Sequence, residues 1–206
     1  LEYIEGGGSG AAQAAFDWEA EPVVGEVLML GGRYCATRLR EGLAVVDLPR
    51  AWERVRYERY LGMLGNETSA TQRLLFAETV PLSAAEACIA REIAGDLEAV
   101  GFDFRIGEES MTVTGIPADL PGVGQAVREM LSEFRESERL SPDDRIRRTA
   151  AVMARCGAMT SRDAMDAEAA RELLREWLRC EGFNYTPDGR PVMTVLTVEE
   201  LAKRLK

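Results

Sequence analysis

Strand-like and helix-like segments alternate along this sequence of 206 residues, and a helix–hairpin–helix unit interrupts the alternation in the middle. Three strand-like runs between glycine-containing turns begin at residue 23, and the chain ends with one more strand-like run and a short helix. Such an order requires helices packed on sheets, so the expected class is α/β or α+β. The strands are expected at 23–30, 34–38, 43–46 and 192–196. A helix is expected at about 50–64, with Arg56 among the side chains that would face water or a partner.

The middle unit predicts that the chain folds as two packed parts. A Ser-x-x-Glu capping box at 83–86 begins a helix, and an alternating hairpin and an amphipathic helix follow it. We therefore expect an inserted, smaller α/β satellite subdomain at 81–140. The flanking segments 23–80 and 141–206 would form a two-layer main subdomain. Residues 1–22 are rich in glycine and acidic side chains, which is typical of a flexible tether.

Charge and residue types narrow the function classes. The chain has 35 acidic and 25 basic side chains and a net charge of -10, which argues against independent binding to a phosphate backbone. It contains no histidine, which excludes Ser-His and Cys-His catalysis and removes the commonest zinc ligand. The four cysteines have no metal-binding spacing and are expected to be buried free thiols. They are Cys35, Cys88, Cys156 and Cys180.

The hydropathy pattern favours a cytoplasmic protein. The sequence has neither an apolar run of 18 residues nor a signal-peptide pattern, so we expect a soluble protein without a membrane partner.

Two segments carry carboxylates at positions where a metal site is conceivable. Asp47 ends a strand and Glu53 lies six residues later in a helix, so both could reach one divalent ion. The alternative is a purely structural role, in which Asp47 caps the helix and Glu53 pairs with an arginine, and we prefer this interpretation. The second segment, Thr186-Pro187-Asp188-Gly189-Arg190-Pro191, is a turn that leads into a strand. Together with Cys156, a helical cysteine among small residues, these positions could form a carboxylate-rich Mg²⁺ or Mn²⁺ site.

A third segment, Gln72-Arg73-Leu74-Leu75-Phe76, lies in the predicted connector at 65–82. An extended peptide of this kind can donate hydrogen bonds through Gln72 and fill an apolar pocket of a partner with its leucine and phenylalanine side chains. The alternative is a short strand at 73–76 that packs on the body. A broad apolar helix face around Trp177 has two similar interpretations, which are core packing and contact with a second copy.

These segments, in this order, resemble the C-terminal domain of the MutL family of DNA mismatch repair proteins. In nuclease-active members the last segment reads Cys-Pro-His-Gly-Arg-Pro, and the first reads Asp-Gln-His-Ala, two further residues and Glu. Here Thr186 and Asp188 replace the cysteine and histidine, and among the first segment's ligands only Asp47 and Glu53 match. Asn184 and the residues after it look most like MutL proteins of the Bacteroides group.

The resemblance implies a non-catalytic homodimerisation and partner-docking domain. It implies that the main subdomain dimerises, that Gln72, Leu74, Leu75 and Phe76 bind the sliding clamp, and that MutS is a further partner. The metal-site positions would be degenerate and hold no metal. DNA would be bound only by the full-length protein, whose ATP-binding domain, with ATP and Mg²⁺, would precede residue 1. No cofactor is expected in this part of the chain.

Two other interpretations stay open from the sequence. One is a residual Mn²⁺- or Mg²⁺-dependent nicking endonuclease that uses the carboxylates of Asp47, Glu53 and Asp188. The other is a regulatory α/β module whose middle subdomain binds a small ligand, although the sequence has no glycine-rich phosphate loop in its favour.

Overall fold

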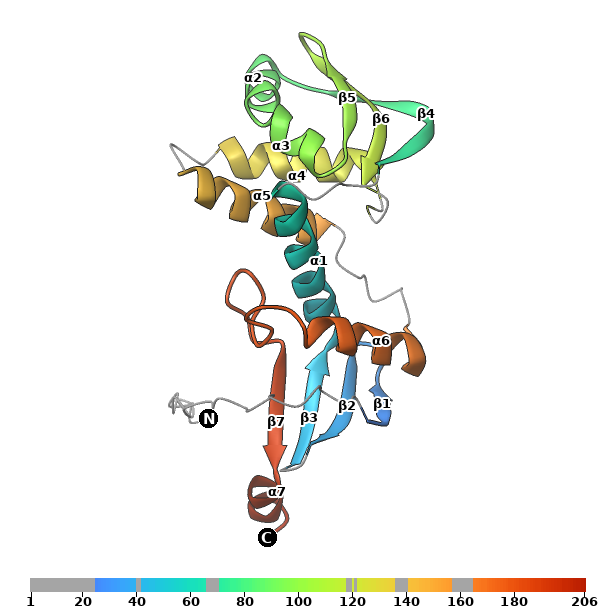
Figure 1. Ribbon diagram of the computed structural model, residues 1–206, viewed down its shortest axis with the longest axis vertical. Coiled ribbons are helices and arrows are strands. Elements are labelled where there is room, and N and C mark those ends of the chain that lie inside the picture. Colours follow the sequence, from blue (N-terminus) through green and yellow to red (C-terminus); the bar gives the residue numbers. More distant parts are fainter. Residues whose placement is uncertain are drawn as a thin grey trace, which may run out of the picture.

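A computed structural model describes residues 25–39, 42–65, 71–117, 120, 122–135, 141–156 and 165–206. These residues form seven strands in two antiparallel sheets and seven helices, so the expected α+β class is confirmed (Figure 1). None of the described helices is both long enough and apolar enough to cross a membrane. The predicted tether at 1–22 lies outside the described residues.

The first sheet has four strands in the order β1-β2-β3-β7, and each neighbouring pair is antiparallel. Its last strand comes from the far end of the sequence. Helix α1 follows β3 without a loop, and helix α7 follows β7 in the same way. The elements of this part are β1 (Val27–Leu30), β2 (Tyr34–Leu39), β3 (Gly42–Asp47), α1 (Leu48–Leu64), α6 (Ala167–Trp177), β7 (Met193–Thr197) and α7 (Val198–Arg204).

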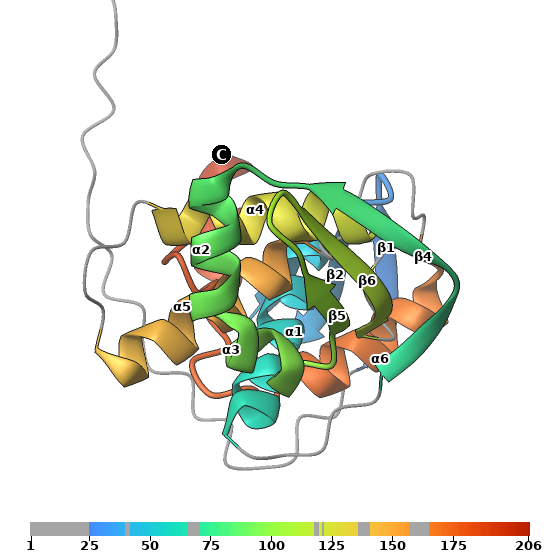
Figure 2. The ribbon, with the colours of Figure 1, turned by 90° about the horizontal axis from the view of Figure 1, so that it is seen from above.

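The second sheet has three antiparallel strands in the order β4-β6-β5, and α2, α3 and α4 lie beside it (Figure 2). Helix α2 begins with the expected capping box, in which Ser83 and Glu86 each accept a hydrogen bond from the other's backbone N–H. The elements are β4 (Thr71–Pro81), α2 (Ala84–Glu92), α3 (Ala94–Ala99), β5 (Asp103–Ile106), β6 (Ser110–Pro117), α4 (Val123–Arg135) and α5 (Pro142–Cys156).

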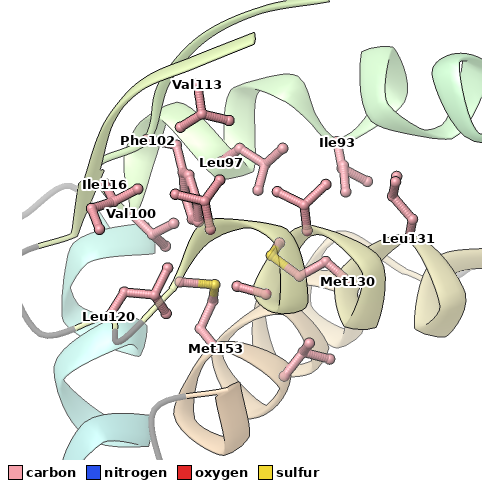
Figure 3. Packing of buried hydrophobic residues seen from close by; sticks show 14 of the residues in the cluster. Ile93, Leu97, Val100, Phe102, Val113, Ile116, Leu120, Met130, Leu131 and Met153 are labelled. Atoms are coloured by element: carbon pink, nitrogen blue, oxygen red, sulfur yellow. The ribbon is translucent and has the colours of Figure 1, made fainter. Parts of the chain in front are cut away.

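Each sheet has its own hydrophobic cluster. One cluster packs β1, β2, β3 and β7 against α1 and α6, and Trp177 is among its buried members. The other packs the second sheet against α2 to α5, with Phe102, Met130 and Met153 near its centre (Figure 3). Helix α1 belongs to both, because Ala51 lies in the first cluster and Tyr60 in the second. The two parts therefore share a continuous helix.

The observed packing differs from the expected boundaries. Strand β4 covers most of the segment predicted to be a connector, and it pairs with β6 in the second sheet, so this sheet begins before residue 81. Helix α5, expected in the main subdomain, contributes Ala150 and Met153 to the second cluster. The reason is that the second sheet needs a third strand and a covering helix to bury its apolar face.

Two side-chain expectations were wrong. Arg56 was expected to face water or a partner, but it is 1% exposed and donates a hydrogen bond to the Tyr60 hydroxyl at 2.9 Å. Cys88 was expected to be buried, but it is exposed, whereas Cys35 is buried and the other two thiols are half-buried.

Candidate functional site

Asp47 lies at the junction of β3 and α1 and is used as a helix cap. Its Oδ1 accepts a hydrogen bond from the Arg50 backbone N–H at 3.3 Å. Its Oδ2 accepts one from the Arg33 guanidinium at 2.9 Å, and the Arg50 Nε lies 3.5 Å from the same oxygen. The side chain is buried. Both carboxylate oxygens are thus engaged by groups of this chain, as the preferred interpretation of this residue expected.

Glu53 is held by an arginine that is distant in sequence. Its Oε2 and Oε1 accept hydrogen bonds from the Arg190 guanidinium at 2.9 and 3.2 Å. Burial raises the pKa of Glu53 above the ordinary value for a glutamate, and the positive charge of Arg190 opposes that rise. The expected pairing of Glu53 with an arginine is therefore confirmed.

The turn at 186–190 closes on itself through side chains. Gly189 has a φ of +82°, which permits the tight turn, and the Arg190 backbone N–H donates to the Thr186 hydroxyl oxygen at 3.0 Å. The Thr186 hydroxyl in turn donates to Asp188. Partial burial raises the pKa of Asp188, but hydrogen bonds from Thr186 and Arg190 outweigh it and hold that pKa below its ordinary value.

Arg190 joins two of the candidate metal positions. Its Nε lies 2.8 Å from Asp188 Oδ2, while its terminal nitrogen contacts Glu53. A guanidinium thus lies between the two carboxylates. Sequence reasoning missed that Arg190 and Arg33 are the partners, because their positions depend on the pairing of β7 and β2 with β3.

Cys156, at the end of α5, donates its S–H to Glu129 Oε2 at 3.1 Å. Burial raises the pKa of this thiol far above its ordinary value, and the hydrogen bond to Glu129 raises it further. The thiol is thus paired with a carboxylate of α4.

The residues present do not fit a divalent metal. The described residues contain no group of three or more His, Cys, Asp or Glu placed to hold an ion. Asp47 and Glu53 are neutralised by separate arginines, and a hydrolytic metal site needs several free donors together.

The segment 72–76 forms part of β4 and not a free connector. Thr71 to Arg73 pair with β6, pairing resumes at Glu78, and the register shifts in between. Leu74 packs against the second cluster, whereas Leu75 is 95% exposed and Phe76 is 87% exposed. The irregularity therefore turns two large apolar side chains toward solvent.

One face of the four-stranded sheet is covered by helices and the other carries exposed apolar residues. Val27, Cys35 and Val46 point into the cluster under α1 and α6. Strand residues of opposite parity point away from that cluster, and among them Leu28 is 64% exposed and Leu30 is 38% exposed. The apolar face around Trp177 is buried in the same cluster, so core packing explains it.

Comparison with known proteins identifies the family. Residues 27–165 match the model of the MutL C terminal dimerisation domain. The chain is 30% identical over 178 residues to the DNA mismatch repair protein MutL of Parabacteroides distasonis and 32% identical over 179 residues to that of Bacteroides fragilis. The protein of the same name from Symbiobacterium thermophilum is 33% identical over 181 residues.

These alignments cover 85%, 85% and 84% of this chain, but only 29%, 29% and 28% of the three relatives. The chain thus spans less than a third of their length. The family model covers more than half of the chain, from β1 to the residue before the N-cap of α6. The chain belongs to the MutL C-terminal dimerisation domain family.

Proposed function

We propose that this chain dimerises and docks partners for a MutL-type mismatch repair protein, and that it has no nuclease activity of its own. The observation that carries the docking role is the exposure of Leu75 and Phe76 at the irregularity in β4. Two adjacent large apolar side chains in water are unusual unless a partner covers them.

The β4 segment has the chemistry of a clamp-binding peptide. Burying Leu75 and Phe76 in a partner pocket would contribute about 1.5–3 kcal/mol each. Gln72, three positions before Leu75, is also exposed and can hydrogen-bond to the same partner. Because β4 already belongs to a sheet, the segment loses less conformational entropy on binding than a disordered peptide would. The bacterial sliding clamp is the partner that this pattern favours.

Titration calorimetry with the cognate sliding clamp tests the docking role. The double variant Leu75→Ala/Phe76→Ala is expected to lose at least about 100-fold in affinity, because both apolar anchors are removed. Tyr185→Ala is the control, since Tyr185 is also a large exposed side chain, at 44%, and lies outside β4. Unchanged clamp binding by the double variant would contradict the docking role, provided that far-UV circular dichroism shows an intact fold.

Dimerisation is supported by the uncovered face of the four-stranded sheet. A second copy that covers Leu28 and Leu30 would bury two of the exposed apolar side chains of this part of the molecule. Dimerisation here would raise the effective concentration of any domains tethered to the chain, such as ATP-binding domains preceding residue 1. MutS and DNA would then be engaged by the full-length protein.

Sedimentation equilibrium over a wide concentration range tests dimerisation. A mass near twice 22.7 kDa is expected for the chain, and Leu28→Glu should shift it toward the monomer because a buried charge is costly. A monomer at every concentration would contradict the dimerisation role.

The absence of nuclease activity is proposed from the ion pairs at the candidate metal positions. Supercoiled DNA incubated with the chain and Mn²⁺ is expected to stay intact. The reason is that Asp47 and Glu53 are each paired with an arginine, so neither carboxylate is free to bind a metal ion. Nicking that disappears in Asp47→Ala would instead support the residual endonuclease.

A further inference from the structure

Helix α7 and its C-cap carry an apolar stripe that the described part of the chain leaves partly exposed. Val198, Leu201 and Leu205 are 66%, 37% and 86% exposed. Their spacing of three and four residues places them on one side of the helix. No residue of α7 is buried. The stripe, defined by these three residues, is therefore a separate apolar surface.

The helix is built to form but lacks a surface to pack on. Its capping box is complete, with Thr197 accepting from the Glu200 backbone N–H and Glu200 accepting from that of Thr197. Seven residues are nevertheless too few for a stable helix in water, because helices shorter than about 12 residues are marginal on their own. Stable formation of α7 thus calls for a surface that covers its stripe.

A second exposed apolar surface lies at the opposite edge of the same sheet. It consists of Leu28 and Leu30 on β1 and Tyr34 on β2, which is 40% exposed. Register places Leu30 opposite Tyr34. In Figure 1, β1 and β7 form opposite edges of the sheet, and α7 lies beyond the end of β7. We call this surface the β1 patch.

We propose that α7 of one protomer packs its stripe on the β1 patch of a second copy of this chain. In a two-fold symmetric dimer, each contact between two different patches occurs twice. In such a dimer the stripe of each protomer lies on the β1 patch of the other protomer, so both stripes and both β1 patches are covered. Pairing of the β1 patch with itself would leave both stripes in water.

Charges near the two surfaces agree with this arrangement. Arg204, in the last turn of α7, comes directly before Leu205 of the stripe, and Glu26 precedes the β1 patch with the same strand parity as Leu28. The inference rests on the proposed dimerisation but goes beyond it, because the family match ends at residue 165, before α7 begins.

Sedimentation equilibrium of matched variants tests the α7 contact. Leu201→Glu is expected to weaken the dimer at least about tenfold, because each dimer loses two buried leucines. Lys203→Glu lies on the other side of α7 and is expected to leave the dissociation constant within about twofold. An unchanged dimer in Leu201→Glu would overturn the inference.

The two proposals fail in different ways. A dimer that dissociates in Leu28→Glu but not in Leu201→Glu keeps the dimerisation role and rejects the α7 contact. A wild-type chain that is monomeric throughout rejects the dimerisation role itself.

Disulfide trapping tests that the contact joins different chains. Two proteins, Leu28→Cys and Leu205→Cys, are prepared in a Cys88→Ala background, which removes the exposed native thiol among the described residues. Oxidation of the mixture is expected to give a disulfide between the two different chains, read by mass spectrometry. Disulfides only between identical chains, or no disulfide in a mixture that sediments as a dimer, would overturn the inference.

Discussion

At the scale of single residues, Glu53 shows how a buried ion pair occupies a position that the sequence offered as a candidate metal ligand. The carboxylate is 5% exposed, and the Arg190 guanidinium lies 2.9 Å from it as the counter-charge. A buried carboxylate that loses its partner keeps the cost of desolvation without the compensating contact. Removing one member of the pair should therefore destabilise the fold more than replacing both members.

We expect Arg190→Ala to lower the free energy of unfolding by about 2 kcal/mol, a value below that for fully buried pairs because Arg190 is 45% exposed. Glu53→Gln/Arg190→Ala should recover part of this loss, since no buried charge remains. Urea unfolding measures both. Equal losses in the single and the double variant would mean that the charge of Glu53 is not what destabilises Arg190→Ala.

Asp188 gives a prediction about pH. Its pKa is below the ordinary value of about 3.9 in the folded chain, so the folded state binds a proton less readily than the unfolded state does. The stabilisation from Asp188 is present above the unfolded pKa and is lost as pH falls through the folded pKa. Asp188→Asn should therefore lose less stability than the wild type between about pH 4.5 and pH 2.5. Urea unfolding across that range checks this, and identical losses would contradict it.

Some of these residues could be interpreted from sequence and others could not. The capping role of Asp47 follows from local spacing to Arg50, and an arginine partner for Glu53 was expected. Arg190 itself could not be chosen, because the contact spans 137 positions and depends on the fold. Arg56 was placed wrongly since helical spacing alone does not show that α5 packs over it, where its guanidinium meets the Met153 carbonyl.

At the scale of elements, β4 shows how one strand divides its residues between core and solvent. Sequence reasoning singled out 72–76 but expected either a peptide in a connector or a short strand. The strand is longer, from Thr71 to Pro81, and the break in register between Arg73 and Glu78 gives neighbouring residues different environments. Such a break depends on the partner strand, so the pattern of β4 alone does not reveal it.

Leu74 and Leu75 form a matched pair for this division. Leu74→Ala is expected to lower the free energy of unfolding by about 1–3 kcal/mol, because Leu74 packs on the second cluster. Leu75→Ala should change it by less than about 0.5 kcal/mol, since that side chain is in water. Thermal or urea unfolding compares them directly. Similar losses in the two variants would contradict the separation of core and docking residues along β4.

At the scale of the whole molecule, α1 is the element that links the two hydrophobic clusters. Its first half packs under the four-stranded sheet and its second half enters the other cluster, where α5 lies against it. The alternation of strands and helices was enough to predict the α+β class and a helix–hairpin–helix unit. It was not enough to assign β4 and α5, because their places depend on contacts with segments far along the chain.

The shared helix predicts that the two clusters unfold together. Separation of the two parts would expose the faces of α1 that each cluster buries, and with them Val55 and Tyr60. Hydrogen exchange followed by mass spectrometry is expected to give equal opening free energies for the most protected amides of β3 and β6. A difference of more than about 2 kcal/mol would show that one part opens alone. In that case α1 would hold the parts side by side without joining them into one cooperative unit.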